Sequence, residues 1–186
     1  KNGLIMSGRV NTKGKKSFKY GKLEASIKLP QTANGLWPAF WMMGDNNKEW
    51  PACGEIDIME MGDAEGIKSG TTSKRINTAL HFGASSSAHE QKYYVANASV
   101  NLQDRNYHTY TMVWDATKIE ISIDGIPFNT FATKDNPYFQ DVFFILFNLA
   151  VGGSFTGITN ISGITALKEG QKAVMYIDWI KIIETK

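Results

Sequence analysis

In the stretch Lys22-Leu23-Glu24-Ala25-Ser26-Ile27-Lys28-Leu29, apolar and polar side chains alternate one by one. On an extended chain the apolar residues share one face and the polar residues share the other. This period of two predicts a half-buried β-strand within Tyr20–Leu29. The alternation returns in Ile119–Ile123, and Asp124-Gly125 then supplies two residues that tolerate positive φ in a tight hairpin turn.

Other segments extend the β pattern along the chain. Further strands are expected around Leu4–Val10, Phe40–Met43, Glu55–Met61, Asn77–Phe82, Tyr107–Asp115, Phe128–Thr133 and Ala173–Ile183. Val142–Val151 is apolar on both faces, which predicts a strand covered on both sides. Helical periodicity is nearly absent, and only Pro137–Asp141 is expected to form a helical turn. Roughly ten short strands predict an all-β fold, an antiparallel β-sandwich or jelly roll, in one domain over residues 1–186.

Composition excludes several classes of protein. A net charge of +2, from 20 basic and 18 acidic side chains, is too small and too evenly spread for a nucleic-acid-binding surface. The longest apolar stretch is too short to span a bilayer, so no membrane partner is expected. Cys53 is the only cysteine, which excludes an intrachain disulfide. The five Trp, seven Tyr and ten Phe residues suit either a core or a sugar cleft, and composition does not separate the two.

The segment Trp50–Met61 carries three acidic residues in an otherwise apolar strand. On a regular strand Glu55 and Asp57 share a face and Glu60 points to the other, but a one-residue bulge around Ile58-Met59 would bring all three together. Solvated strand faces usually mix in Lys, Thr or Ser, whereas every polar position here is acidic. A polar outer face is the alternative interpretation.

The spacing of the two glutamates indicates a reaction type. With the bulge, their Cα atoms would lie ~13 Å apart at ~3.3 Å per residue. If each side chain leans inward, the carboxyl groups come within ~5 Å, the separation expected of a retaining glycosidase. Three neighbouring carboxylates cannot all ionise cheaply, so at least one pKa must rise, as a general acid requires.

Gly54-Glu55-Ile56-Asp57-Ile58-Met59-Glu60 resembles the active-site signature of glycoside hydrolase family 16, and the additional Met59 resembles its laminarinase-type endo-β-1,3-glucanases. Other segments resemble the family in the same order along the chain, namely Ser7–Arg9, Tyr20–Ala25, Gly35–Met42, Leu80–Gly83, Tyr107–Tyr110, Asn148–Gly153 and Tyr176–Ile180. The resemblance implies a concanavalin-like jelly roll with a concave sugar-binding cleft. It also implies an endo-acting retaining hydrolase of β-1,3- or mixed β-1,3/1,4-glucans such as laminarin.

The resemblance also assigns roles to residues. By position, Glu55 resembles the nucleophile, Glu60 the general acid and base, and Asp57 the residue that tunes their protonation. The implied substrate-binding residues are Trp37, Trp41, His81, Arg9, Asn148 and Phe155. The two tryptophans share one strand face, with core packing as the alternative, and Phe155 stands where the family often has tryptophan and lacks the indole donor.

Catalysis by this family requires no cofactor, but the resemblance implies a structural calcium away from the cleft, with Asp178 as one ligand. Because Asp178 shares the parity of Val174 and Ile180, we expect it to be buried and to need a partner. Several dozen residues that form the family's N-terminal strands, and any targeting segment, are expected to be missing. The β-glucan is the expected partner of a monomer that is secreted, at the cell surface or periplasmic.

Two other functions remain open. A non-catalytic β-glucan-binding sandwich domain would share the fold and the aromatic residues, but it would not need three carboxylates on one face. The same chemistry could also act on agarose or carrageenan, galactans processed by relatives with the same bulged strand. Transglycosylation would follow if a sugar instead of water intercepted the glycosyl-enzyme.

Overall fold

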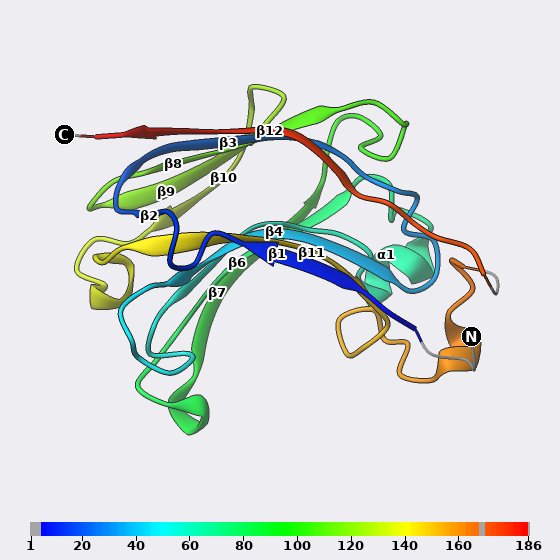
Figure 1. The fold of residues 1–186 in the computed structure, drawn as a ribbon, viewed down its shortest axis with the longest axis horizontal. Coiled ribbons are helices and arrows are strands. Elements are labelled where there is room, and N and C mark those ends of the chain that lie inside the picture. Colours follow the sequence, from blue (N-terminus) through cyan, green and yellow to red (C-terminus); the bar gives the residue numbers. More distant parts are fainter. Residues whose placement is uncertain (1–4, 168–169, 186) are drawn as a thin grey trace.

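A computed structural model of the chain describes residues 5–167 and 170–185. Within these residues, two antiparallel sheets lie face to face as a β-sandwich (Figure 1). The larger sheet has seven strands, in the order β1-β11-β4-β5-β6-β7 with β2 beside β11. The smaller sheet has five strands, in the order β10-β9-β8-β3-β12. The antiparallel all-β fold expected from the sequence is confirmed.

The elements have the following bounds. The larger sheet contains β1 (Gly8–Asn11), β2 (Ser17–Phe18), β4 (Leu36–Gly44), β5 (Glu55–Glu60), β6 (Arg75–Phe82), β7 (Glu90–Asn97) and β11 (Phe143–Val151). The smaller sheet contains β3 (Gly21–Lys28), β8 (His108–Trp114), β9 (Lys118–Ile123), β10 (Ile126–Ala132) and β12 (Tyr176–Glu184). The helical segments of the described chain are α1 (Ala64–Ser69), η1 (Ser86–Ala88), η2 (Pro137–Phe139) and η3 (Ile161–Gly163).

Alternation builds the smaller sheet. In β3, Leu23, Ala25 and Ile27 are fully buried between the sheets, and the polar residues between them face outward. The turn from β9 to β10 has positive φ at Asp124 and Gly125, as the sequence predicts. A half-buried strand therefore forms wherever one apolar face can be covered by the opposite sheet.

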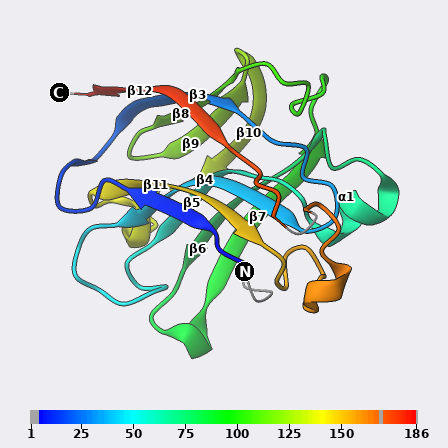
Figure 2. The ribbon, with the colours of Figure 1, turned by 45° about the vertical axis from the view of Figure 1, so that its right-hand side comes forward.

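The central strands of the larger sheet are buried on both faces. β11 lies between β1 and β4 (Figure 2), and its residues from Phe143 to Phe147 are all buried, which confirms the expectation of a strand covered on both sides. Phe144 and Leu146 point away from the smaller sheet and pack with Ala39 and Trp41 in a second apolar cluster. The outer face of this sheet therefore has an apolar floor of its own.

The elements β2, β7, α1, η1 and η3 have no counterpart among the expected ones. β2 has two residues, and β7 is an edge strand exposed on nearly every residue, so it shows no alternation. α1 has six residues, too few for a helical period, and the expectation that only Pro137–Asp141 turns helically was therefore wrong. No helix in the described part of the chain is long and apolar enough to cross a bilayer.

Two expected strands start later than predicted. The strand expected at Leu4–Val10 begins at Gly8, and Leu4 itself lies outside the described residues. The strand expected at Ala173–Ile183 begins at Tyr176. In both, the preceding residues find no ladder partner at a sheet edge, although their side chains fit the pattern.

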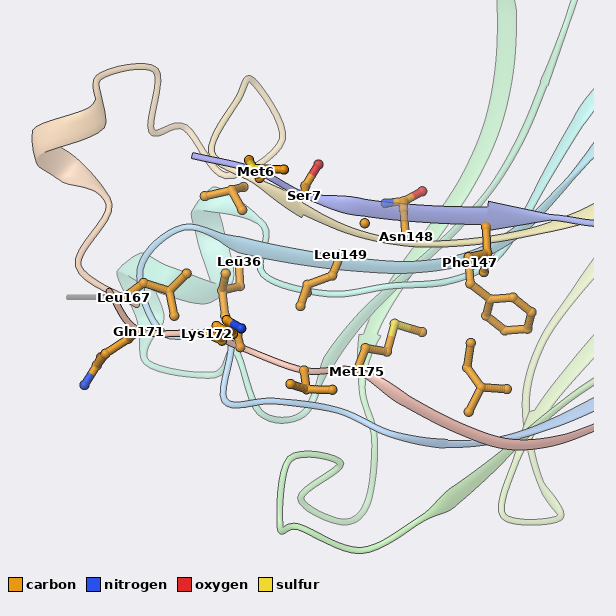
Figure 3. A pocket seen from close by; sticks show the side chains of 16 residues that line it. Met6, Ser7, Leu36, Phe147, Asn148, Leu149, Leu167, Gln171, Lys172 and Met175 are labelled. Carbon is orange, nitrogen blue, oxygen red and sulfur yellow. The ribbon is translucent and has the colours of Figure 1, made fainter. Parts of the chain in front are cut away.

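The sandwich is open along the side where β1 ends the larger sheet and β12 ends the smaller one. Val10 pairs with Phe147 and Ile180 pairs with Ala25, so both point between the sheets. Nevertheless Val10 is 60% and Ile180 is 41% exposed. A groove of about 440 Å³ lies there, and Figure 3 shows Phe147 and Met175 directed into it. The core is therefore uncovered at this edge.

Candidate active site

Strand β5 carries a one-residue bulge. Trp41 and Phe40 are neighbours in β4, but their partners in β5 are Asp57 and Met59, so Ile58 is skipped. The pairing of β5 with β6 shifts at the same place. The bulge lets two consecutive apolar side chains enter the core and turns the last residue of β5 to the outer face. The bulge expected from the sequence is confirmed.

One cavity of about 320 Å³ collects the three acidic side chains on the outer face of the larger sheet. Its walls come from the ends of β1 and β11 and from β4 and β5. The lining residues are Ser7, Arg9, Trp37, Ala39, Trp41, Glu55, Asp57, Glu60, Asn148 and Ala150. Seven of the nine residues expected to act in the cleft are therefore brought together, and the other two, His81 and Phe155, contact the lining residues Asp57 and Trp37.

Burial controls the protonation of the trio. It raises the pKa of Glu60 well above its usual range, and the charges of Asp57 and Glu55 add to the effect, while the hydrogen bond from Trp37 opposes it. Burial and the charge of Glu55 likewise raise the pKa of Asp57 well above its usual range. Burial also raises the pKa of Glu55, but His81, a hydrogen bond from Trp50 and the charge of Arg9 act against it.

Trp37 is tied to both a carboxyl group and a second aromatic ring. Its indole N–H donates a 2.8 Å hydrogen bond to Glu60 Oε1. Its ring stacks on Phe155, with centroids 4.6 Å apart and planes 14° apart. One face of the Trp37 ring is thus covered by Phe155, which places Phe155 as a support for Trp37 at the wall of the cavity.

Trp41 is held from two sides. Its indole N–H donates a 2.8 Å hydrogen bond to Asn148 Oδ1, and the guanidinium carbon of Arg9 lies 4.6 Å from its ring centroid. Arg9 and Asn148 are themselves paired across β1 and β11. These three residues form one connected wall of the cavity.

His81 lies beside the middle carboxyl group. Its Nε2 is 3.3 Å from Asp57 Oδ2. Ligand atoms of Glu55, Asp57 and His81 fall within 4.8 Å of one another, close enough for a metal ion. Acidic and histidine side chains also gather in this way without an ion, so the geometry by itself assigns no metal here.

Two residues in the vicinity were not expected from the sequence. Trp50 gives Glu55 a hydrogen bond, and His89 packs beside both Trp50 and His81, with ring centroids 4.9 Å and 5.1 Å away. Trp50 opens the acidic segment, so its proximity in the chain was a usable signal. His89 comes from the β6–β7 loop, and the sequence offered no signal for its position. His108 lies on the smaller sheet, where it contacts Asp104 and Asp124.

The expectation that Asp178 is buried was wrong. Asp178 is exposed, because it is the bulged residue between Ile177 and Trp179 on the edge strand β12. Among the described residues, Asp178 belongs to no group of acidic or histidine side chains that could hold a metal. A structural calcium at Asp178 stays a prediction that rests on the family resemblance alone.

Comparison with solved structures gives close matches. A chain described as "Glycoside hydrolase family 16 endo-glucanase from Bacteroides ovatus in complex with G4G3G-2F-DNP" has a TM-score of 0.96 and 63% identity, covering 98% of this chain and 77% of that one. Another, "Bacteroides ovatus mixed linkage glucan PUL (MLGUL) GH16 in complex with G4G4G3G Product", has a TM-score of 0.94 and 64% identity, covering 95% and 74%.

Comparison with curated sequences agrees. "Glucan endo-1,3-beta-glucosidase A1" of Niallia circulans is 34% identical over 192 residues, covering 95% of this chain and 26% of that relative. "Clotting factor G alpha subunit" of Tachypleus tridentatus is 29% identical and covers 96% of this chain and 25% of that relative. The chain thus spans about a quarter of the length of these two relatives. The profile of "Glycosyl hydrolases family 16" matches residues 5–181, nearly the whole chain, and the chain therefore belongs to this family.

Proposed function

We propose that the chain is an endo-acting β-glucanase that hydrolyses mixed β-1,3/1,4-glucan with retention of configuration. The observation that carries the proposal is the bulge at Ile58, which puts Glu55, Asp57 and Glu60 on one face of one cavity. Two relatives with 63% and 64% identity, described as an endo-glucanase and as part of a mixed-linkage glucan system, support this substrate class over laminarin alone.

The electrostatics support the division of labour between the two glutamates. Glu55 has a hydrogen bond from Trp50 and the charge of Arg9 to stabilise its ionised form. Glu60 has two acidic neighbours, so its protonated form is favoured more strongly. Glu55 is therefore the ionised nucleophile, and Glu60 is the general acid.

The reaction then runs in two steps. The Glu55 carboxylate attacks the anomeric carbon, the glycosidic bond breaks, and Glu60 gives its proton to the departing oxygen. The resulting glycosyl-enzyme is an ester of Glu55. Glu60, now ionised, takes a proton from water, which attacks the same carbon and releases Glu55 as a carboxylate. Two inversions at the anomeric carbon give net retention.

The walls of the cavity supply the sugar contacts. Trp37 is half-buried and has one ring face covered by Phe155, so its other face is available to stack on a glucosyl ring. Trp41 lines the cavity but is only 8% exposed and packs in the apolar cluster of the outer face, with Arg9 over its ring. The guanidinium of Arg9 and the amide of Asn148 can bond sugar hydroxyls while they orient Trp41.

The open edge of the sandwich supports a further proposal about the domain. We propose that additional strands of this family pack over Val10 and Ile180 and are not part of this chain. A polymeric substrate too large to enter a cell supports a secreted, surface or periplasmic location, and a monomer is proposed because one chain supplies the whole trio.

Product analysis on barley mixed-linkage glucan, laminarin and agarose tests the function, with Glu55→Ser as the blank and NMR of the first-formed anomer as the stereochemical readout. Short oligosaccharides with the β-anomer from mixed-linkage glucan are expected. Products from agarose alone would move the substrate to galactans. Binding without products, in folded protein, would mean a carbohydrate-binding domain and overturn the proposal.

A further inference from the structure

His89 occupies a specific place beside the carboxylate trio that its loop position does not predict. It follows η1 and directly precedes β7, and its Nε2 lies 2.9 Å from His81 Nδ1. The two imidazole planes are 18° apart and their centroids 5.1 Å apart, which fits an edge-to-edge hydrogen bond between the rings. His89 also contacts the Trp50 ring, with centroids 4.9 Å apart. One side chain thus touches two residues that themselves reach the carboxyl groups.

Those two residues act on different members of the trio. His81 presents its Nε2 to Asp57, and Trp50 donates a hydrogen bond to Glu55. A shift of His89 would therefore disturb the partners of the nucleophile and of the middle carboxyl group together.

The backbone fixes the position of His89. Gly83 has a φ of +129°, and a Cβ at this position would lie 2.1 Å from the carbonyl oxygen of Ala88 and 3.2 Å from the Cα of His89. The loop from β6 to β7 can fold back this tightly only over a glycine. The hairpin backbone therefore places the Cα of His89 close to Gly83, two residues after His81 in the chain.

The tautomer of His81 depends on which atom carries the proton between its Nε2 and Asp57. Asp57 Oδ2 is buried and has no hydrogen-bond partner among the described residues, and His81 Nε2 lies 3.3 Å from it. With the proton on Nε2, His81 is the donor to Asp57, Nδ1 of the neutral imidazole is the acceptor, and the donor to Nδ1 is Nε2–H of His89. With the proton on Asp57 instead, Nε2 would accept and Nδ1–H of His81 would donate to His89.

We propose that His89 is a positioning residue for hydrolysis. Its Nε2–H fixes His81 in the tautomer that aims Nε2–H at Asp57, and its ring braces Trp50 against Glu55. The effect of His89 on turnover rests on the proposed function, whereas the tautomer does not. Third residues that hold a catalytic histidine or carboxylate in register act in this way in other sites.

Long-range ¹H–¹⁵N NMR of the imidazole rings tests the tautomer directly, because the chain has three histidines. In the wild type, His81 and His89 should both show the Nε2–H pattern. In His89→Gln, an amide N–H can replace the donor, and His81 should keep its pattern. In His89→Phe, the ring remains but the donor is lost, and His81 should leave the pure Nε2–H state. His81 as the Nδ1–H tautomer in the wild type would overturn the proposal.

Kinetics on mixed-linkage glucan supply the second readout. His89→Phe should lower kcat about tenfold with KM within about twofold, and His89→Gln should recover most of the loss. His108→Gln, on the smaller sheet, is the matched control and should change neither kcat nor the His81 spectrum. Equal kcat for the Phe and Gln variants would contradict the role of the donor. A wild type without any hydrolysis would instead reject the proposed function, while the NMR result would still decide the tautomer.

Discussion

The indole N–H of Trp37 donates its hydrogen bond to Oε1 of Glu60, 2.8 Å away across two neighbouring strands. The general acid proposed here is therefore oriented by β4, although it belongs to β5. The bond also favours the ionised carboxylate, since an indole can only donate. Trp37 thus has a part in the protonation of Glu60 besides any contact with sugar.

Replacing Trp37 by Phe tests that part. The stack on Phe155 is kept and the N–H is lost, so the pKa of Glu60 should rise further. The alkaline limb of the pH profile of kcat/KM should move to higher pH, and the maximum should fall about tenfold because the acid is less well oriented. Phe155→Leu is the control, because it loosens the stack but keeps the N–H. An unmoved alkaline limb in Trp37→Phe would reject the role.

Replacing Glu60 by Gln should stabilise the fold at alkaline pH. The folded-state pKa of Glu60 is raised, so between its ordinary pKa and the raised one the folded state binds more protons, and stability falls as pH rises through this window. Gln removes this loss and keeps an oxygen for Trp37. We expect Glu60→Gln to melt about 2–4 °C above the wild type at pH 8, with the gap closing by pH 4. A gap of equal size at both pH values would contradict the linkage.

The alternation of apolar and polar residues predicted those strands that bury one face against the opposite sheet. The alternation of Leu23, Ala25 and Ile27 predicts β3. On a regular strand Glu60 would point to the face opposite Glu55 and Asp57, and the bulge is predicted because the three carboxyl groups can act together only on one face. β7 could not be predicted in this way, since an exposed edge strand buries neither face and its sequence need not alternate.

The predicted residues of the candidate site lie mainly on strands, and the two that were missed lie in loops. Trp37 and Asn148 were predicted from the family resemblance, and the register between β4 and β11 brings both to the same cavity. His89 was not, because its place follows from a loop that folds back over Gly83. The prediction that Asp178 is buried was wrong for a related reason. A bulge in an edge strand interrupts the alternation of sides on which that prediction was based.

Gly54→Ala should destabilise the start of β5 by a steric clash in addition to the backbone strain of a positive φ. Gly54 has a φ of +84°, and a Cβ there would lie 2.5 Å from the carbonyl oxygen of Tyr138. Gly125→Ala is a matched control, because its φ is +79° and nothing lies within 4 Å. The control should lose about 1 kcal/mol of unfolding free energy, and Gly54→Ala about 3 kcal/mol or more. Equal losses in urea titrations would mean that the contact is relieved by movement of the loop.

Ile180→Ala measures whether the edge between β1 and β12 is open in solution. Ile180 points inward but is 41% exposed, whereas Ile27, on the neighbouring strand β3, is fully buried. Ile27→Ala should cost about 2–5 kcal/mol of unfolding free energy. Ile180→Ala should cost less than about 1 kcal/mol, because few atoms surround its side chain and water already reaches it. Similar costs for the two variants would mean that the edge is covered, and sedimentation of the wild type at rising concentration would then show whether a second copy of the chain covers it.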